Sequence, residues 1–447
     1  MVTVTDMALA REARYLRQRE WLEKERRPLI SFTMNIAGPV KTSPLIRAGF
    51  ELGKSRILYQ LSQAKIEVIR QRTLHAPTGD ELLICASGDP RRLKQSMAAL
   101  EESEAIGRLW DMDVIDENGV KLERDAPRLC LLCNERAAVC ARSRKHTAQE
   151  LFEKTEALLQ EHFQRDMTRR VAETALRAVL FELLTTPKPG LVDRCNNGAH
   201  TDMDCFTFCA SAATLFPWFE RCAQSGAGCT DAAQLLRLLR WPGMEAERLM
   251  LEATQGVNTH KGAIFSLGIL CAACGWLLAR NEAAKPGALS RACALLAKEP
   301  LEKELGEIRC SAPQTAGQLL YQKNGVTGAR GEAMRGFPTA LGALPVLEKA
   351  LDAGRSLNDA GVETLLHILL HAEDSNFIKR SSPKRREEWL AQMRQMEAES
   401  EMQKAQKLDG LFIAENISPG GSADLLAATY FMHDAQGLTP VPPCLRL

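Results

Sequence analysis

Residues 147–170 read TAQELFEKTEALLQEHFQRDMTRR, and the character of the sequence changes across this stretch. The stretch is charged and amphipathic, which suits a connecting helix. Before it, short apolar runs typical of buried strands alternate with helical segments, whereas long Ala- and Leu-rich helical stretches follow it. We therefore predict a multidomain fold, with an N-terminal mixed α/β domain over 1–150, a helical linker over 151–170 and a larger all-α domain over 171–447.

The α/β part carries three apolar runs bounded by Pro, Gly and Asp, as buried strands are. Asn118 and Gly119 predict a hairpin turn that joins the last run to residues 120–123. Helix-spaced apolar residues follow Pro44 in the stretch 43–66. The predicted strands are 29–36 (LISFTMNI), 81–87 (ELLICAS) and 109–115 (LWDMDVI).

One helical stretch of the second part, residues 262–279, runs 18 residues without a charge, which reaches the length of a membrane span. Its abundance of Gly, Ala and Cys favours a helix buried at the centre of a large helical domain, and this is what we expect. The predicted helices are 171–184, 205–222, 245–253, 262–279, 362–371 and 423–431.

The composition limits the classes of function. Of 447 residues, 45% are hydrophobic and 25% are charged, and the net charge is +1. These values argue against a disordered chain and against general attraction to nucleic acid or to an anionic membrane. The first 20 residues hold no apolar segment with a cleavage site, so we expect no signal peptide. Fourteen cysteines then predict reduced thiols in a cytoplasmic protein.

Asp111 and Asp113 lie two apart on a predicted strand, so both carboxylates should project from one face. Neighbouring carboxylates repel each other unless a cation lies between them, and Mg²⁺ with substrate phosphate oxygens is the usual occupant. Such a pair suits transfer of a nucleotidyl group with loss of diphosphate. The alternative is a strand whose outward positions are simply acidic.

Polar and basic residues elsewhere in the first part suit a phosphorylated substrate. The loop NIAGPVKTS follows a predicted strand, and its amides and lysine could surround a phosphate. Arginines 11, 14, 17 and 19 crowd one N-terminal helix, although a solvated helix face is the preferred interpretation of Arg17 and Arg19. The predicted substrate-binding residues of this part are Arg14, Asn35, Lys41 and Arg108.

Cys130, Cys133, Cys140 and His146 form a ligand set that Zn²⁺ would accept. Their spacing is tighter than in most zinc modules. Two alternatives stay open: CLLC could be a small apolar core patch, and the basic segment ARSRKH could bind phosphate.

Five loops of the second part concentrate Gly, Asp, Lys, Arg and His at helix ends. Glycine lets the backbone approach a ligand closely, and Asp193, Asp202 and Asp204 offer metal ligands or a general base. Polar, capped loops are also normal between helices. Five such clusters in one helical domain nevertheless favour a shared pocket for a phosphate-rich substrate.

SFTMNIAGPVK, GRLWDMDV and RLCLLCNERAAVCARSRKH fall between about residues 10 and 148. Through them the first part resembles the apo-citrate lyase phosphoribosyl-dephospho-CoA transferase family, also called holo-citrate lyase synthase. The resemblance implies transfer of a phosphoribosyl-dephospho-CoA group from a triphosphate precursor to a serine of the acyl carrier (gamma) subunit of apo-citrate lyase, releasing diphosphate. It makes Asp111 and Asp113 catalytic and Mg²⁺-binding candidates.

TPKPGLVDRCNNGAHTDMD, NTHKG, GVTGARGEA and SPGGSAD occur in that order between about residues 170 and 430. Through them the second part resembles the triphosphoribosyl-dephospho-CoA synthase family, although Cys195 stands where we expect His. The resemblance implies that ATP and 3′-dephospho-CoA give 2′-(5″-triphosphoribosyl)-3′-dephospho-CoA and free adenine, with Mg²⁺. The catalytic candidates are then Asp193, Asp204, Glu332 and Asp374, with Asp202 as a Mg²⁺ ligand and Lys188, Asn258, His260, Lys261, Arg330, Ser418, Gly420 and Gly421 as substrate-binding residues.

The product implied for the second part is the substrate implied for the first. We therefore expect a bifunctional transferase of citrate lyase prosthetic-group biosynthesis. The alternatives are the equivalent enzyme for malonate decarboxylase and a carrier-binding protein without catalysis. The long cysteine-rich segment favours citrate lyase, and the presence of Asp111, Asp113, Lys261 and Arg330 argues against a non-catalytic protein.

Overall fold

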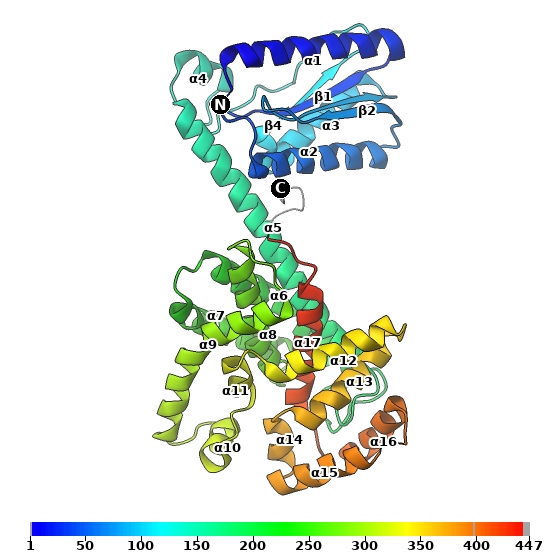
Figure 1. Ribbon diagram of the computed structural model, residues 1–447, viewed down its shortest axis with the longest axis vertical. Helices are drawn as coiled ribbons and strands as arrows, with labels where there is room; N and C mark the ends of the chain where they lie inside the picture. Colours follow the sequence, from blue (N-terminus) through cyan, green and yellow to red (C-terminus); the bar gives the residue numbers. More distant parts are fainter. Residues whose placement is uncertain (1, 397, 441–447) are drawn as a thin grey trace. The chain divides into compact units, whose positions relative to one another are not determined.

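The structure, a computed structural model, describes residues 2–396 and 398–440. It consists of two compact units, and the chain passes from the first to the second between Phe163 and Gln164, within helix α5 (Ala148–Leu184). The first unit has a small sheet with helices and the second is helical throughout, which confirms the predicted fold class (Figure 1). Residues 441–447 of the predicted all-α domain lie outside the described residues.

Four antiparallel strands form the sheet in the order β2-β3-β1-β4. Strands β1 (Leu29–Met34), β3 (Glu81–Ala86) and β4 (Trp110–Ile115) fall within the three predicted strands. The edge strand β2 (Val68–Leu74) was not predicted. The hairpin prediction was partly wrong, because beyond the turn only Lys121 forms a bridge, to Ile115, and no further strand develops.

Side-chain alternation gives the sheet two different faces. Phe32, Ile84, Met112 and their neighbours pack under α2 (Pro44–Gln63) and α3 (Pro90–Ser103). Helix α1 (Val4–Glu25) covers part of the other face through Trp21 and Leu22 (Figure 1). Asp111 and Asp113 lie at partly exposed positions of β4 that alternate with buried ones, so both carboxylates belong to the face that α1 covers. The unit also contains η1 (Ala105–Leu109) and α4 (Ala137–Ser143).

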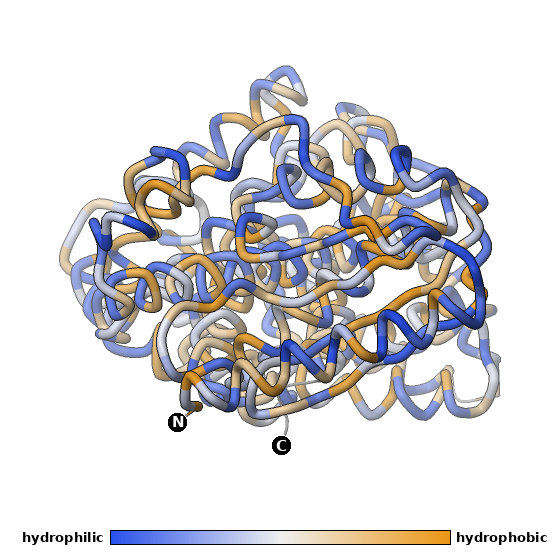
Figure 2. The backbone as a smooth tube through the Cα atoms, turned by 90° about the horizontal axis from the view of Figure 1, so that it is seen from above, coloured by the Kyte–Doolittle hydropathy of each residue, from blue (hydrophilic) through white to orange (hydrophobic). Residues whose placement is uncertain are grey.

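The second unit packs the end of α5 with a dozen further helices. Hydrophilic and hydrophobic residues alternate along the helical turns that can be followed in Figure 2. The helices after α5 are α6 (Cys205–Gly228), α7 (Ala232–Ala253), α8 (Lys261–Leu278), α9 (Pro286–Arg309), α10 (Ala316–Asn324), α11 (Gly328–Met334), α12 (Pro338–Asp352), α13 (Leu357–His371), α14 (Ser375–Arg380), α15 (Pro383–Gln395), α16 (Glu401–Ala414) and α17 (Gly420–Ala435).

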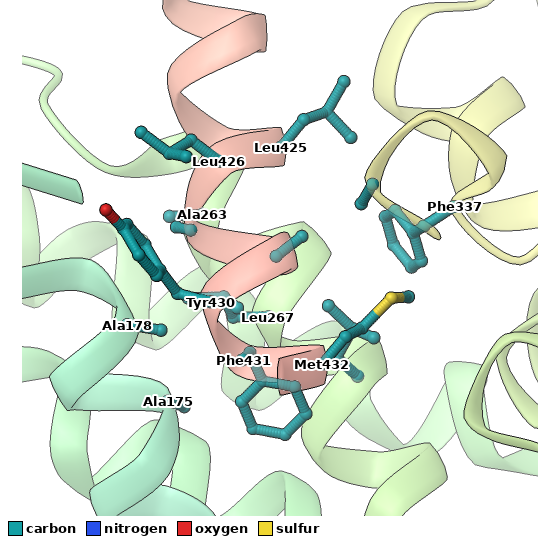
Figure 3. Packing of buried hydrophobic residues seen from close by; sticks show 14 of the residues in the cluster. Ala175, Ala178, Ala263, Leu267, Phe337, Leu425, Leu426, Tyr430, Phe431 and Met432 are labelled. Carbon is teal, nitrogen blue, oxygen red and sulfur yellow. The ribbon is translucent and has the colours of Figure 1, made fainter. Parts of the chain in front are cut away.

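Helix α8 lies at the centre of this unit. Among the described helices it is the one long and apolar enough to cross a membrane, yet 78% of it is buried in the unit, which confirms the expected core helix. Its small residues permit close contact: a Cβ on Gly275 would lie 2.2 Å from the Ala223 carbonyl oxygen of α6. Ala263 and Leu267 of α8 pack between α5 and α17, with Tyr430 and Phe431 beside them (Figure 3).

Candidate active sites

A cleft of about 370 Å³ opens in the helical unit where the end of α5, the loop after it and the N-terminal ends of α8 and α17 meet. Four cationic side chains face it together with three carboxylates, so it is built for a charged ligand. Of the predicted site residues, those that line the cleft are Lys188, Asp202, Asn258, His260, Lys261, Ser418 and Gly420.

The loop after α5 is shaped by two buried aspartates. Asp193 accepts hydrogen bonds from the backbone N–H groups of Lys188 (2.9 Å), Cys195 (2.7 Å) and Asn196 (3.1 Å). Asp409 of α16 accepts from the N–H of Gly190 (3.0 Å) and from the Asn196 amide (2.8 Å). These bonds fold the loop so that Lys188 turns into the protein. Asp193 itself does not line the cleft, and Cys195 is exposed.

Glu182 and Lys188 form an ion pair on the cleft wall. Their side chains are 7% and 1% exposed, so little water screens either charge. The pair lies six residues apart, on the last turn of α5 and on the loop that follows. A buried charge is tolerated only when it is paired, so each residue fixes the position and the charge of the other.

The Asp424 carboxylate of α17 lies at the N-terminal end of α8. It accepts a hydrogen bond from the Ala263 backbone N–H, one of the free donors at that helix end. Burial, with Glu182 and Asp374 nearby, raises the pKa of Asp424 well above its ordinary value. Asp424, whose pKa is raised, and Glu182, which pairs with Lys188, thus line the same cleft.

His260 precedes α8 and is buried beneath the cleft. Its Nδ1 shares a 2.6 Å hydrogen bond with Ser211 Oγ of α6. Burial, with Lys188 nearby, lowers the pKa of His260 to about 3. The imidazole is therefore neutral at physiological pH, and it can donate or accept a hydrogen bond but cannot hold a phosphate as a cation. Its Nε2 has no partner among the described residues.

A second histidine, His200, lines the cleft and links its own loop to Ser418 and to helix α14. His200 Nε2 is 2.8 Å from Ser418 Oγ, and Arg380 Nη2 is 3.3 Å from His200 Nδ1. Asp202 approaches the same ring at 3.7 Å but is 61% exposed. Burial and Arg380 lower the pKa of His200. Arg380 and the exposed Lys379 bring positive charge to the cleft.

At the rim, Lys261 is 57% exposed and pairs with Glu247 of α7 at 2.8 Å. Asn258 Oδ1 accepts from the Lys261 backbone N–H at 3.3 Å, which holds the first turn of α8. Lys261 can therefore swing toward an anion in the cleft if its exposed ion pair opens, because such pairs contribute at most about 1 kcal/mol.

Several predicted residues lie outside the cleft. Asp204 caps α6, and hydrogen bonds from Thr207 lower the pKa of its carboxyl. Asp374 caps α14 and accepts from the Ser422 N–H (2.7 Å) and Oγ (2.9 Å), beside Gly421. Glu332 accepts from Thr339 at the start of α12. Hydrogen bonds within the fold thus occupy all three of these carboxylates.

Arg330, a predicted substrate-binding residue, also lies outside this cleft. It pairs with Glu304 at 2.9 Å and lines a different cleft.

Two clefts of the sheet unit contain one each of the β4 aspartates and are lined by arginines of α1. A cleft of about 160 Å³ is lined by Asp111, Asn35, Lys41 and Arg14. A shallower one of about 950 Å³ contains Asp113. Arg11 and Arg14 line both. Burial and Arg11 lower the pKa of Lys41, whose Nζ donates to the Ile36 carbonyl oxygen at 2.5 Å.

The arginines of α1 differ from one another in their surroundings. Arg14 (2.8 Å) and Arg17 both pair with Glu81, and their side chains are 26% and 23% exposed. The prediction of a solvated face was therefore wrong for Arg17, because Glu81 lies beneath it on the sheet. Arg19 is 59% exposed and, within the described part of the chain, has an ion pair only with its helix neighbour Glu23, as predicted for a solvated position.

Each aspartate of β4 has a basic partner. Asp111 lies 3.2 Å from Arg128, and Asp113 lies 2.6 Å from Lys121. Arg128 also donates to the Trp110 carbonyl oxygen (2.7 Å) and pairs with buried Glu101, whose pKa burial raises. A cation bound by Asp111 and Asp113 would share these carboxylates with Arg128 and Lys121.

The predicted cysteine and histidine ligands come together. The possible ligand atoms of Cys130, Cys133, Cys140 and His146 all lie within 4.8 Å of one another. Arg108 donates to the Cys130 carbonyl oxygen and so lies against this cluster, outside the two clefts of the sheet unit.

Three residues that the sequence patterns did not single out are central to these arrangements. Glu182 is the acidic residue of an apolar helix end, VLFELL, and Asp424 follows the glycines of SPGGSAD. Arg128 immediately precedes the cysteine-rich segment. A lone charge in an apolar helix is the signal that could have identified the first two.

Two protein-family profiles match the chain. The profile described as ATP:dephospho-CoA triphosphoribosyl transferase matches residues 168–440, and that described as apo-citrate lyase phosphoribosyl-dephospho-CoA transferase matches residues 2–162. Protein CitXG of Haemophilus influenzae is 34% identical over 96% of this chain and 95% of its own length. Protein CitXG of Leuconostoc mesenteroides is 33% identical over 93% of this chain and 95% of its own length.

A further relative covers the helical unit. The 2-(5″-triphosphoribosyl)-3′-dephosphocoenzyme-A synthase of Pectobacterium atrosepticum is 42% identical over 60% of this chain and 88% of its own length. Each unit thus matches a family profile of its own, and the two CitXG proteins are similar to the chain over both units. The chain belongs to the CitXG family of fused transferases, bifunctional enzymes that make the citrate lyase prosthetic group.

Proposed function

We propose that the cleft of the helical unit binds ATP and 3′-dephospho-CoA and joins them, with adenine as the leaving group. The observation that carries this assignment is that Glu182 and Asp424 line the same cleft, together with cationic side chains. Glycosyl transfer needs both kinds of group, since positive charge develops at the ribose C1′ while a base leaves and a hydroxyl arrives.

In the proposed reaction, the bond from C1′ of ATP to adenine breaks and a bond from C1′ to the 2′-oxygen of dephospho-CoA forms. Glu182, held as an anion by Lys188, stabilises the positive C1′ and takes the proton of the attacking hydroxyl. Asp424, whose pKa is raised, gives a proton to the departing adenine. One proton is removed and one is donated, so the reaction balances.

The triphosphate of ATP belongs at the cationic side of the cleft. Lys261, Lys379 and Arg380 present their charges there, beside the N-terminal end of α8. His260 offers its unpartnered Nε2 as a neutral hydrogen-bonding group. Asp202 is exposed at the same rim and fits a Mg²⁺ ion that accompanies the triphosphate, since Mg²⁺ usually keeps waters and takes one or two carboxylates.

The pantetheine arm of dephospho-CoA fits a neighbouring cleft of about 610 Å³. Trp218, Leu236 and Phe265 give it an apolar wall, and Arg237, Arg240 and Arg330 give it positive charge. The Glu247–Lys261 ion pair joins the two clefts, because Glu247 lines one and Lys261 the other. Arg330 would then contact the dephospho-CoA diphosphate and not the triphosphate of ATP.

For the sheet unit, we propose transfer of the phosphoribosyl-dephospho-CoA group to a serine of the apo-citrate lyase acyl carrier subunit. The serine oxygen attacks the α-phosphorus of the triphosphate, and the bond to diphosphate breaks. Arg11, Arg14 and Lys41 are placed to hold the diphosphate. Asp111 and Asp113 would hold Mg²⁺, which neutralises charge on the phosphates when bound. Free thiols throughout the described residues fit a cytoplasmic enzyme with this partner.

The test is chromatography of the purified chain incubated with ATP, 3′-dephospho-CoA and Mg²⁺. We expect adenine and a heavier CoA adduct in equal amounts. Apo-carrier of citrate lyase is then added, and the increase in its mass is measured by mass spectrometry. Apo-carrier of malonate decarboxylase is treated in the same way as the comparison. Folded protein that forms no adenine would contradict the assignment of the helical cleft, and loading of only the malonate decarboxylase carrier would contradict the proposed partner.

A further inference from the structure

The segment from Arg128 to His146 folds around its cysteines and has almost no core of its own. Among the residues that the structure describes, its cysteines belong to no hydrophobic cluster of the unit, and Leu131 alone packs at the edge of one. Helix α4, the one helix within it, has only seven residues. A segment with so little buried apolar surface usually needs a disulfide or a metal to hold one conformation.

The backbone around Cys130 and Cys133 has the form of a metal-binding turn. The Cys130 sulfur accepts hydrogen bonds from the backbone N–H groups of Leu132 and Cys133. The Cys130 N–H donates to the Glu135 carbonyl oxygen at 2.6 Å, and the Ala137 N–H donates to the Arg128 carbonyl oxygen at 2.8 Å. The first two bonds direct backbone N–H groups at the sulfur and so hold it in place within the turn.

The arrangement of the side chains also points to a metal. Cys133 Sγ and Cys140 Sγ are 3.3 Å apart, well beyond a disulfide bond of about 2.05 Å. Two thiolates on a tetrahedral zinc lie about 3.8 Å apart, because each Zn–S bond is about 2.3 Å. The buried Nε2 of His146 has no partner among the described residues. A disulfide would leave His146 without a partner, whereas a metal would satisfy all four residues.

We propose that Cys130, Cys133, Cys140 and His146 bind one Zn²⁺, and that the zinc-bound segment positions Arg128 against Asp111. Three thiolates and one imidazole close a tetrahedron with no position for substrate, so the ion is structural. Arg128 precedes the first ligand by two residues and reaches Asp111 at 3.2 Å, while Arg108 donates to the Cys130 carbonyl oxygen. The second part of this proposal rests on the proposed role of Asp111.

The first experiment measures metal without reference to activity. The full chain, purified without chelator, is analysed for zinc by plasma mass spectrometry, and we expect about one equivalent. Cys140→Ser should lose the zinc, whereas Cys310→Ser, at an exposed cysteine of the helical unit, should retain it. Reconstitution with Co²⁺ should give a thiolate charge-transfer band in the control Cys310→Ser and none in Cys140→Ser. Absence of zinc together with absence of that band would overturn the proposal. A thiol titration of the denatured, metal-free chain would also overturn it if two of the 14 cysteines failed to react, because those two would form a disulfide.

The second experiment separates positioning from folding and from the proposed function. Cys140→Ser should load the acyl carrier about 100-fold more slowly, because small displacements of positioned groups have effects of that size. Its release of adenine should stay at the wild-type rate. His146→Cys keeps four zinc ligands and should therefore retain both the zinc and the wild-type rate of carrier loading. Normal loading by zinc-free protein would overturn the positioning role, whereas zinc-replete wild-type protein that loads no carrier would refute only the proposed function.

Discussion

The Asp424 carboxylate occupies the space that a side chain at residue 262 would need: a Cβ on Gly262 would lie 1.8 Å from Asp424 Oδ2. Gly262 is the second residue of α8, so the carboxylate reaches the helix end only because no side chain is present there. The contact brings together the segments NTHKG and SPGGSAD, which lie far apart in the sequence.

Gly262→Ala should therefore displace Asp424 and reduce adenine release. We expect a loss of at least about 100-fold, in the range associated with removal of a general acid. The matched control is Gly342→Ala in α12, where an added Cβ meets nothing within 4 Å. This control should keep full activity and be more stable by up to about 1 kcal/mol, since Ala favours a helix over Gly. Equal activity in the two variants would refute the contact's importance.

Asp424→Asn should abolish adenine release and change how stability depends on pH. The folded protein holds a proton on Asp424 more tightly than the unfolded chain does, so this residue lowers wild-type stability as pH rises from about 4 through its raised pKa. The asparagine variant lacks that decline. Without substrates its melting temperature should exceed the wild-type value at pH 8 and approach it at pH 5, as measured by calorimetry. Parallel curves would show that Asp424 titrates normally.

Lys188→Met should destabilise the protein by about 3 to 5 kcal/mol in urea unfolding, because it leaves the buried charge of Glu182 unpaired. Adding Glu182→Gln should recover much of that stability but none of the adenine release. Arg248→Met, at an exposed ion pair with Glu245, should cost less than about 1 kcal/mol and leave activity intact. Activity in the double variant would remove Glu182 from the mechanism.

His260 should make the helical unit sensitive to acid. The unfolded chain binds a proton on this histidine below pH about 6.5, but the folded protein does not until about pH 3. Stability is thus lost as pH falls through this window, by about 2 kcal/mol at pH 5. In His260→Gln that part of the loss should vanish, and comparison of urea midpoints at pH 7.5 and pH 5 measures it. An equal loss in both proteins would mean that His260 is already protonated when folded.

The local patterns of the sequence were sufficient for much of the fold. Two-residue alternation in LWDMDVI indicated a strand with both aspartates on one face, and the structure has this arrangement. The edge strand β2, VIRQRTL, was missed because its polar residues outnumber its apolar ones and little of it is buried. Its neighbour β3 is buried along its whole length and was recognised.

The sequence predicted which loops form the site better than it predicted which residues of those loops line the cleft. Lys188, His260 and Ser418 come from three loops that were singled out, and they share one cleft. Loop composition could not reveal that Glu332 of α11 accepts a hydrogen bond from Thr339 of α12 while Arg330 faces a different cleft, because both facts depend on helix packing. Glu182 could not be recognised as a partner of Lys188 until the loop was seen to fold back.

The most direct test of two separate, consecutive sites in one chain is the mass of apo-carrier incubated with ATP, 3′-dephospho-CoA, Mg²⁺ and enzyme. Wild type should load the carrier. Asp111→Asn should release adenine without loading, and Asp424→Asn should do neither. A mixture of the two variants should load the carrier again, since the intermediate made by one reaches the intact site of the other. Loading by either variant alone, or none by the mixture of folded proteins, would contradict the account.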